Sequence, residues 1–209
     1  MGLREFLGEY GTTAKFPDIA GKYQGRNLVV CGDAIGIWSD LEEFGCRRDF
    51  HRGSVEKNGW DFLTVNKLIE TFPGNVEHAY SNEPSVLVRF IAARRCEYTR
   101  EFEGPRHTHS ISEGTKCVWP FGGHGTSGLG AVLTGLGLGY DHVVICGMPL
   151  DDGPHNGEPP WRKCAFKTSE AAGNVNTGMN SHWKKAIQLA FEGRVKSMSG
   201  RTREWLGAP

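Results

Sequence analysis

The chain has 209 residues, which is enough for one domain with a full hydrophobic core and short for two. Lysine plus arginine equal aspartate plus glutamate at 24 each, and this balance argues against a strongly basic nucleic-acid clamp. No apolar run reaches the roughly 20 residues of a membrane-spanning helix, and residues 1–16 lack the apolar core of a signal peptide, so we expect one domain, 1–209, in the cytoplasm.

The predicted elements alternate along the chain after a peripheral segment, 1–26, that combines a helix with an irregular lead-in. Short apolar runs that stop at polar or turn residues predict strands at 27–33, 60–66, 76–81 and 142–147, a last one at 194–198 and a weaker one near 117–119. A short helix is predicted to begin at Ser39, which would cap it, and another to begin at Thr126. Further helices are predicted over 67–72, from Glu83 to about Arg95, and over 180–192. The proline-rich residues 151–179 are predicted to form an irregular insertion near the site.

Alternating strands and helices imply parallel pairing with right-handed crossovers. We therefore predict an α/β fold with a single doubly wound, mostly parallel sheet and helices on both faces, which is a Rossmann-like architecture. Ligands in such sheets bind outside the carboxyl ends of the strands. The candidate site residues that follow predicted strands or begin a helix are Gly32, Asp33, Asn66, Ser81, Gly125, Thr126, Ser127, Gly147, Asp151 and Asp152.

The sequence FGGHGTSG, residues 121–128, places small residues where a helix begins. A helix start offers unpaired N–H groups and a positive dipole end to an anion, which suits a phosphate at Gly125, Thr126 and Ser127. The segment is neither a Walker A motif nor a GxGxxG fingerprint after the first strand. The glycines further along the helix predict close packing of its backbone on the sheet.

Two polar residues end the first strands. The Asp33 carboxylate can accept hydrogen bonds from a ribose or a base, and it can equally cap its own turn. The Asn66 amide both donates and accepts, which suits the edge of a base or sugar, although a strand-terminal asparagine also serves local roles.

A second polar group follows the strand at 142–147. Asp151 and Asp152 could hold Mg²⁺ beside a diphosphate, or they could form a solvated turn with their side chains on opposite sides. His182, at the predicted start of the last helix, is a candidate general base because a helix N-terminus favours the neutral imidazole. The alternative is a surface histidine without a catalytic role.

Several segments together resemble a known superfamily. They are GDA after the first strand, FLTVNKLIETFPGNVEHAYSNEP, GTSGLGAVLTGLGLGYDHVVICGMPL, and the last helix with RVKSMSG. Over most of residues 27–200 the chain is similar to Rossmann-like proteins that include bacterial sialyltransferases, archaeal-type 6-hydroxymethylpterin diphosphokinases and phage proteins of unassigned function. A phage-type member would work in the cytoplasm of its host cell.

The resemblance implies roles for matching positions. Gly32 and Asn66 would line the donor site, the Thr126–Ser127 helix start would contact the nucleotide part of the donor, and His182 would be the base. The chain departs from the sialyltransferase turn after the first strand, because Asp33 replaces its first asparagine and no Pro-Ser follows. This departure leaves the identity of the donor open.

We therefore expect a nucleotide- or sugar-nucleotide-dependent, glycosyltransferase-like group transferase that acts on a hydroxyl acceptor. The acceptor could be a glycan, a modified DNA base or a small molecule. The sequence also leaves open whether the protein forms a homo-oligomer. Mg²⁺ is not required in this interpretation. The alternatives are a Mg²⁺-dependent diphosphokinase that uses Asp151 and Asp152, and a nucleotide-binding protein without catalysis.

Overall fold

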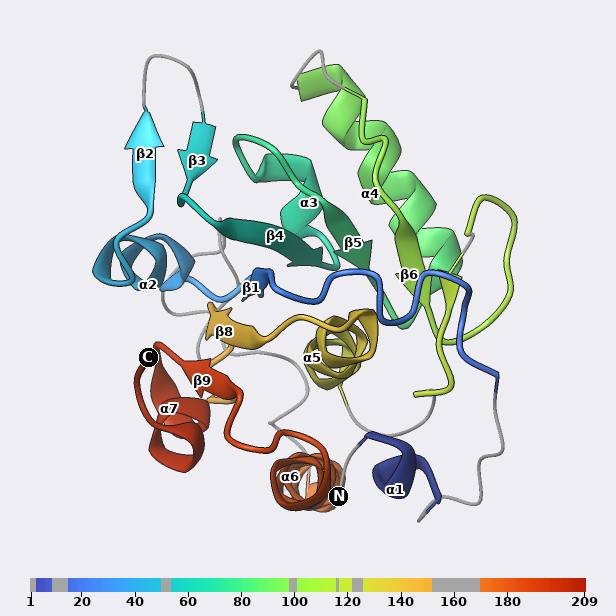
Figure 1. Cartoon of the computed structure of the whole chain (residues 1–209), viewed down its shortest axis with the longest axis vertical. Helices are drawn as coiled ribbons and strands as arrows, with labels where there is room; N and C mark the ends of the chain where they lie inside the picture. The colour runs from blue at the N-terminus through green and yellow to red at the C-terminus, as the bar shows by residue number, and fades with distance from the viewer. Residues whose placement is uncertain are drawn as a thin grey trace.

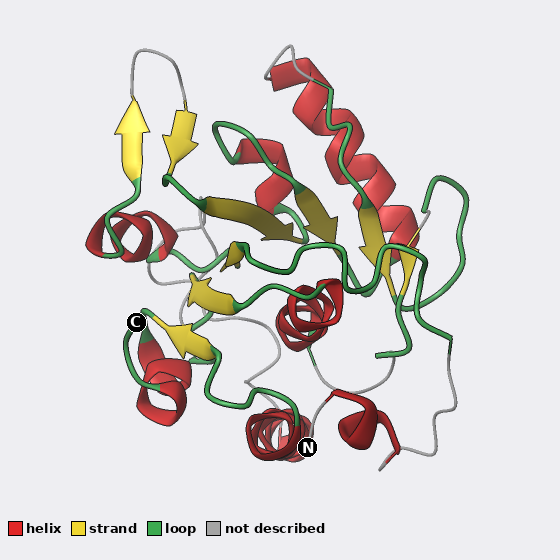
Figure 2. Cartoon of the chain, in the orientation of Figure 1, coloured by secondary structure: helices red, strands yellow, loops and turns green. Residues whose placement is uncertain are grey.

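The computed structural model describes residues 3–8, 15–49, 54–97, 101–115, 117–121, 126–151 and 170–209. Figure 1 colours and labels the elements in their order along the chain, and Figure 2 distinguishes the helices from the strands. The strands are β1 (Asn27–Cys31), β2 (Arg47–Asp49), β3 (Ser54–Glu56), β4 (Trp60–Val65), β5 (His78–Tyr80), β6 (Arg106–Thr108), β7 (Cys117–Val118), β8 (His142–Cys146) and β9 (Val195–Ser197). The helices are α1 (Leu3–Gly8), α2 (Ile37–Glu43), α3 (Leu68–Thr71), α4 (Pro84–Glu97), α5 (Ser127–Leu138), α6 (Glu170–Leu189) and α7 (Gly200–Leu206).

Seven strands form one open sheet in the order β7-β6-β5-β4-β1-β8-β9, and every neighbouring pair in it is parallel. The predicted α/β, Rossmann-like class is confirmed. The chain moves outward from β1 through β4 to β7, and then returns to the other side of β1 with β8. The direction therefore reverses between β1 and β8, which is where doubly wound sheets bind ligands.

The central strands are apolar throughout because helices cover both faces of the sheet. Leu28 and Val30 of β1 belong to the core on one face, while Val29 and Cys31 belong to the core on the other. Helices α1, α5 and α6 cover the first face, and α2 and α3 cover the second, with α4 packed beside them in a third cluster. Figure 1 shows these two layers on opposite sides of the sheet.

Helix α5 lies against the sheet at three of its glycines, as predicted. A Cβ atom on Gly130 would meet the Tyr80 hydroxyl, one on Gly137 would meet the Trp119 ring, and one on Gly135 would lie 2.6 Å from Leu28 Cδ2. These glycines let large side chains of the sheet reach the helix backbone, and the predicted close packing is confirmed.

Two predicted helices begin elsewhere in the structure, and a third helix was not predicted. Helix α2 begins at Ile37 after Gly36, and Ser39 lies inside its first turn with its hydroxyl donating to Gly36 O. Helix α6 begins at Glu170, so the irregular insertion predicted for 151–179 is wrong over its last ten residues, 170–179. Glycines and asparagines there have low helix propensity, so the sequence pattern did not indicate this first part of α6. Helix α7 was not predicted.

Strand β6 and the β2–β3 ribbon were also missed, because these short strands are mostly polar and no apolar run marks them. Helix α1 buries Phe6 and Leu7 in the same core as α5. Among the described residues, no helix has both the length and the apolar character that a membrane span requires.

Gly137→Ala should lower the free energy of unfolding by roughly 1 to 3 kcal/mol, because the new methyl group would overpack the contact with Trp119. Gly8→Ala is the matched control, since its Cβ would meet nothing within 4 Å. Urea denaturation of both variants measures the effect. An equal stability of the two variants would show that α5 does not press on the sheet at this glycine.

Candidate functional site

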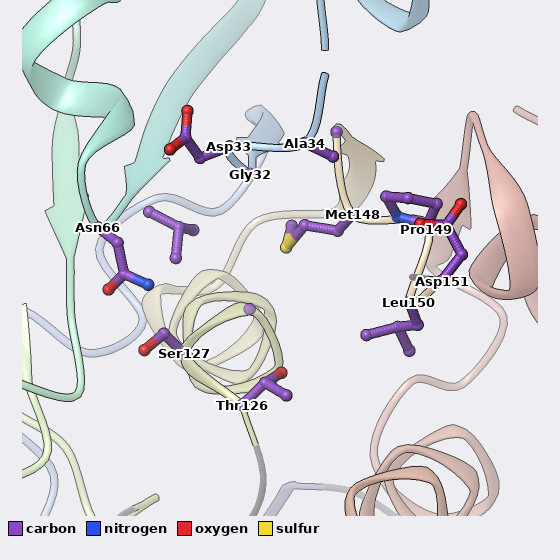
Figure 3. A pocket seen from close by; sticks show the side chains of 13 residues that line it. Gly32, Asp33, Ala34, Asn66, Thr126, Ser127, Met148, Pro149, Leu150 and Asp151 are labelled. Carbon is purple, nitrogen blue, oxygen red and sulfur yellow. The ribbon is translucent and has the colours of Figure 1, made fainter. Parts of the chain in front are cut away.

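A cavity of about 200 Å³ opens at the carboxyl ends of the central strands. Four segments line it, and Figure 3 shows their side chains. They are Gly32–Ala34 after β1, Val65 and Asn66 at the end of β4, Thr126–Gly128 at the start of α5, and Gly147–Asp151 after β8. The cavity therefore lies at the reversal between β1 and β8.

The structure brings most of the predicted site residues together. Those that line the cavity are Gly32, Asp33, Asn66, Thr126, Ser127, Gly147 and Asp151. Ser81 does not line it and instead donates a hydrogen bond to Asn66. Gly125 and Asp152 lie outside the described residues.

The two loops that follow β1 and β8 touch through backbone atoms. A Cβ on Gly32 would lie 2.5 Å from Gly147 O, and a Cβ on Gly147 would lie 2.5 Å from Gly32 O. Gly147 also has a φ of +67°, a conformation that side chains rarely adopt. Ala34 N donates to Gly147 O at 3.1 Å, so the contact is hydrogen-bonded as well.

A buried carboxylate holds the second of these loops. Asp40 in α2 is 5% exposed, and its Oδ2 accepts from Gly147 N at 2.7 Å and from the Ser199 hydroxyl at 2.6 Å. Hydrogen bonds to an ionised group are the strong ones in proteins. Sequence analysis missed this residue because its two partners lie more than a hundred positions away along the chain.

The Asn66 amide has a fixed orientation. Its Oδ1 accepts from the Ser81 hydroxyl at 2.9 Å, while that hydroxyl accepts from Glu83 N at 3.0 Å. The amide nitrogen is therefore the end that faces the cavity, and Figure 3 shows it pointing toward the middle. Asn66 offers the cavity a donor.

Two residues of the cavity wall have strained backbones. Asn66 has a φ of +54° and Leu150 a φ of +55°, in the left-handed region that non-glycine residues seldom occupy. A bulky residue such as Leu150 is especially unusual there. Such conformations cluster at functional sites, where the surrounding structure holds them.

The start of α5 forms the opposite wall. Thr126 caps the helix, since its Oγ1 accepts from Leu129 N at 3.2 Å, and its carbonyl accepts from Gly130 N at 3.1 Å. The N–H groups of Ser127 and Gly128 precede these bonded donors, at positions that have no partner inside a helix. They stand at the cavity wall together with the positive end of the helix dipole.

The described charged residues of the lining, Asp33 and Asp151, are both acidic. In the described part of the chain, no three histidine, cysteine, aspartate or glutamate side chains are grouped so that they could hold a metal ion. A Mg²⁺ site at Asp151 and Asp152 stays a prediction, because Asp152 lies outside the described residues.

His182 does not lie at a helix start. Helix α6 begins twelve residues earlier, at Glu170, so the argument from the helix dipole is wrong. His182 is also not among the described residues that line the cavity. Its neighbour Trp183 is buried and donates from Nε1 to Thr126 Oγ1 at 3.3 Å, which brings this part of α6 beside the start of α5. The catalytic role of His182 stays a prediction.

In comparisons with protein-family models, curated proteins and solved structures, no match to this chain was found. The fold class therefore depends on the observed topology alone, and the resemblance to sialyltransferases and pterin diphosphokinases stays a prediction.

Asp40→Asn should destabilise the protein by roughly 1.5 to 3 kcal/mol, because a neutral amide oxygen accepts the two hydrogen bonds from Gly147 N and Ser199 more weakly than a carboxylate oxygen does. The control is Glu43→Gln, in the same helix as Asp40, which removes an exposed ion pair with Arg203 of α7. It should change stability by less than about 1 kcal/mol. Chemical denaturation compares the two. A loss at Asp40 no larger than that at Glu43 would contradict its role in holding the loop.

Proposed function

We propose that the cavity binds a nucleotide or sugar nucleotide and that the protein transfers a group from it to a hydroxyl acceptor. The observation that carries the proposal is the convergence of hydrogen-bond donors on one cavity at the reversal of the sheet. The donors are the Asn66 amide and the N–H groups at the start of α5. This arrangement favours a ligand that presents oxygen acceptors.

The parts of a nucleotide match the polar groups in the lining. A phosphate fits the start of α5, where backbone N–H groups and the helix dipole favour an anion. The Asp33 carboxylate would repel a phosphate but can accept from sugar hydroxyls or from a base. A cavity of about 200 Å³ is smaller than most ligand sites, roughly 300 to 1,000 Å³, so the cavity would enclose only one end of such a ligand.

The transfer step would follow from this placement. A base takes the proton of the acceptor hydroxyl, the acceptor oxygen bonds to the transferred carbon, and the bond from that carbon to the phosphate oxygen breaks. The N–H groups of Ser127 and Gly128 would stabilise the charge that develops on the leaving phosphate. His182, in the part of α6 beside the start of α5, is the candidate base.

A second candidate function is nucleotide binding without catalysis. It is favoured by one observation, that His182 does not belong to the described cavity lining. The diphosphokinase alternative depends on Asp151, which does line the cavity, and on Asp152. Turnover that requires Mg²⁺ would favour the diphosphokinase.

Nucleoside mono- and diphosphates should bind the protein with dissociation constants below about 1 mM, equivalent to roughly −4 kcal/mol. Asn66→Ala should weaken this binding about three- to tenfold, the effect of one hydrogen bond. Asn58→Ala, on an exposed residue far from the cavity lining, is the control. Isothermal titration calorimetry measures all three proteins, and an absence of binding to wild type would remove the basis of the proposal.

His182→Ala should lower donor hydrolysis about 10² to 10⁴-fold, the usual loss with a general base, while nucleotide affinity stays within a few-fold. His142→Ala, at an exposed residue of β8, is the matched control. Hydrolysis of the donor, followed by product analysis, is the first assay. Hydrolysis at the wild-type rate, or a loss of donor binding, would show that His182 is not the base.

A further inference from the structure

A second cluster of polar side chains lies on the α5 face of the sheet, near the amino ends of β4 and β5. It forms a continuous row of hydrogen bonds. The bonds run from Trp119 Nε1 to His107 Nδ1 at 2.9 Å, His107 Nε2 to His78 Nδ1 at 3.0 Å, His78 Nε2 to the Tyr140 hydroxyl at 2.9 Å, and that hydroxyl to Asp61 Oδ2 at 2.6 Å. All five side chains are buried.

The chemistry of the two ends fixes the direction of every bond in the row. An indole Nε1 only donates, so His107 Nδ1 must accept and the proton of this ring sits on Nε2. His78 then accepts at Nδ1 and carries its own proton on Nε2. Asp61 accepts at the far end. Both imidazoles are neutral, and neither has a ring nitrogen left for another proton.

This arrangement excludes two other roles. A proton conduit needs a group at each end that can release and regain a proton, and the indole of Trp119 does neither near neutral pH. A metal ligand needs a free ring nitrogen, and both nitrogens of His78 and of His107 are already bonded.

We propose that His78 and His107 form an acid-sensitive lock of the fold, which holds only while both rings are neutral. A second proton on His107 would turn Nδ1 into a donor that faces the Trp119 N–H. A second proton on His78 would likewise face the His107 N–H. Either event breaks the row inside the core, where an unpaired polar group is costly.

The lock also fastens the segment before β1. The Tyr23 ring stacks on Tyr140 with centroids 5.0 Å apart and meets His78 edge-on at 4.9 Å. Arg26 donates to Asp61 Oδ1 at 2.5 Å. Because Tyr23 and Arg26 contact members of the row directly, loss of the row would loosen their segment.

The pKa values agree with the geometry. Burial, and secondarily the Arg26 charge, lowers the pKa of His78 to about 3. Burial, and secondarily His78, lowers the pKa of His107 well below its ordinary value. A histidine in an unfolded chain has a pKa of about 6.5. The unfolded state therefore binds more protons, so this stability is present above about pH 6.5 and is lost as the pH falls.

Other ionisable groups lie around the two rings. They are Asp61, Arg26, Tyr23, Tyr140, Cys117 and Glu77. Burial raises the pKa values of Tyr23 and Tyr140, so both stay neutral. Burial also raises the pKa of Glu77, which stabilises the fold as the pH falls and so has the opposite sign.

The test is the unfolding equilibrium constant in urea between pH 7.5 and pH 5.0. Each locked ring should raise that constant about 30-fold over this interval, and both together roughly 900-fold. His78→Gln and His107→Gln should each remove one of the two factors. His142→Gln, at an exposed histidine, should leave the pH dependence unchanged. An unaltered pH dependence in both lock variants would overturn the proposal.

Nitrogen NMR of the wild-type imidazoles provides a measurement that needs no variant. Both rings should carry their proton on Nε2 and should not titrate between pH 7.5 and 5.0 in the folded protein. A ring with its proton on Nδ1, or one that gains a second proton while the chain stays folded, would also overturn the lock.

Discussion

The contact between the backbones of Gly32 and Gly147 is the constraint on which the site depends. Strands β1 and β8 pair in register, with Cys31 beside Cys146, so their following loops leave the sheet at the same level. Two side chains would not fit between loops this close, and glycine at both positions removes them. Asp40 of α2 then holds the second loop, because its carboxylate accepts a hydrogen bond from Gly147 N. The cavity lies where these loops meet beside the start of α5.

The two ends of the sheet treat polar groups in opposite ways. At the carboxyl ends, the Asn66 amide and the start of α5 present donors to an open cavity beside two strained backbones. On the amino side, the row that ends at Asp61 pairs each polar atom with a specific neighbour. Strained backbones lie at one end of the sheet, and a row of hydrogen-bonded polar side chains lies at the other. This pattern is expected when function and stability occupy separate regions of one fold.

The sequence allowed the central strands, the glycine-rich helix and most of the cavity lining to be predicted. Apolar runs mark β1, β4 and β8, and the rule for doubly wound sheets then selects the residues that follow them. Interactions between distant segments could not be predicted. Asp40 reaches Gly147 across 107 positions, and His78 reaches Tyr140 across 62, with no local pattern to signal either pair. The start of α6 was missed because the glycines and asparagines there have weak helix propensity.

The hydroxyl of Ser81 gives the cavity a preference between ligands of similar shape. Since this hydroxyl donates to Asn66 Oδ1, the amide cannot turn its oxygen to the cavity without breaking a bond. A keto oxygen or an unprotonated ring nitrogen opposite Asn66 would be paired, whereas an amino group in the same place would face another donor. Such mismatches of hydrogen-bond polarity discriminate more strongly than a missing methylene does. Under the proposed function, a single serine outside the cavity would thus decide which tautomers and which bases can pair with Asn66.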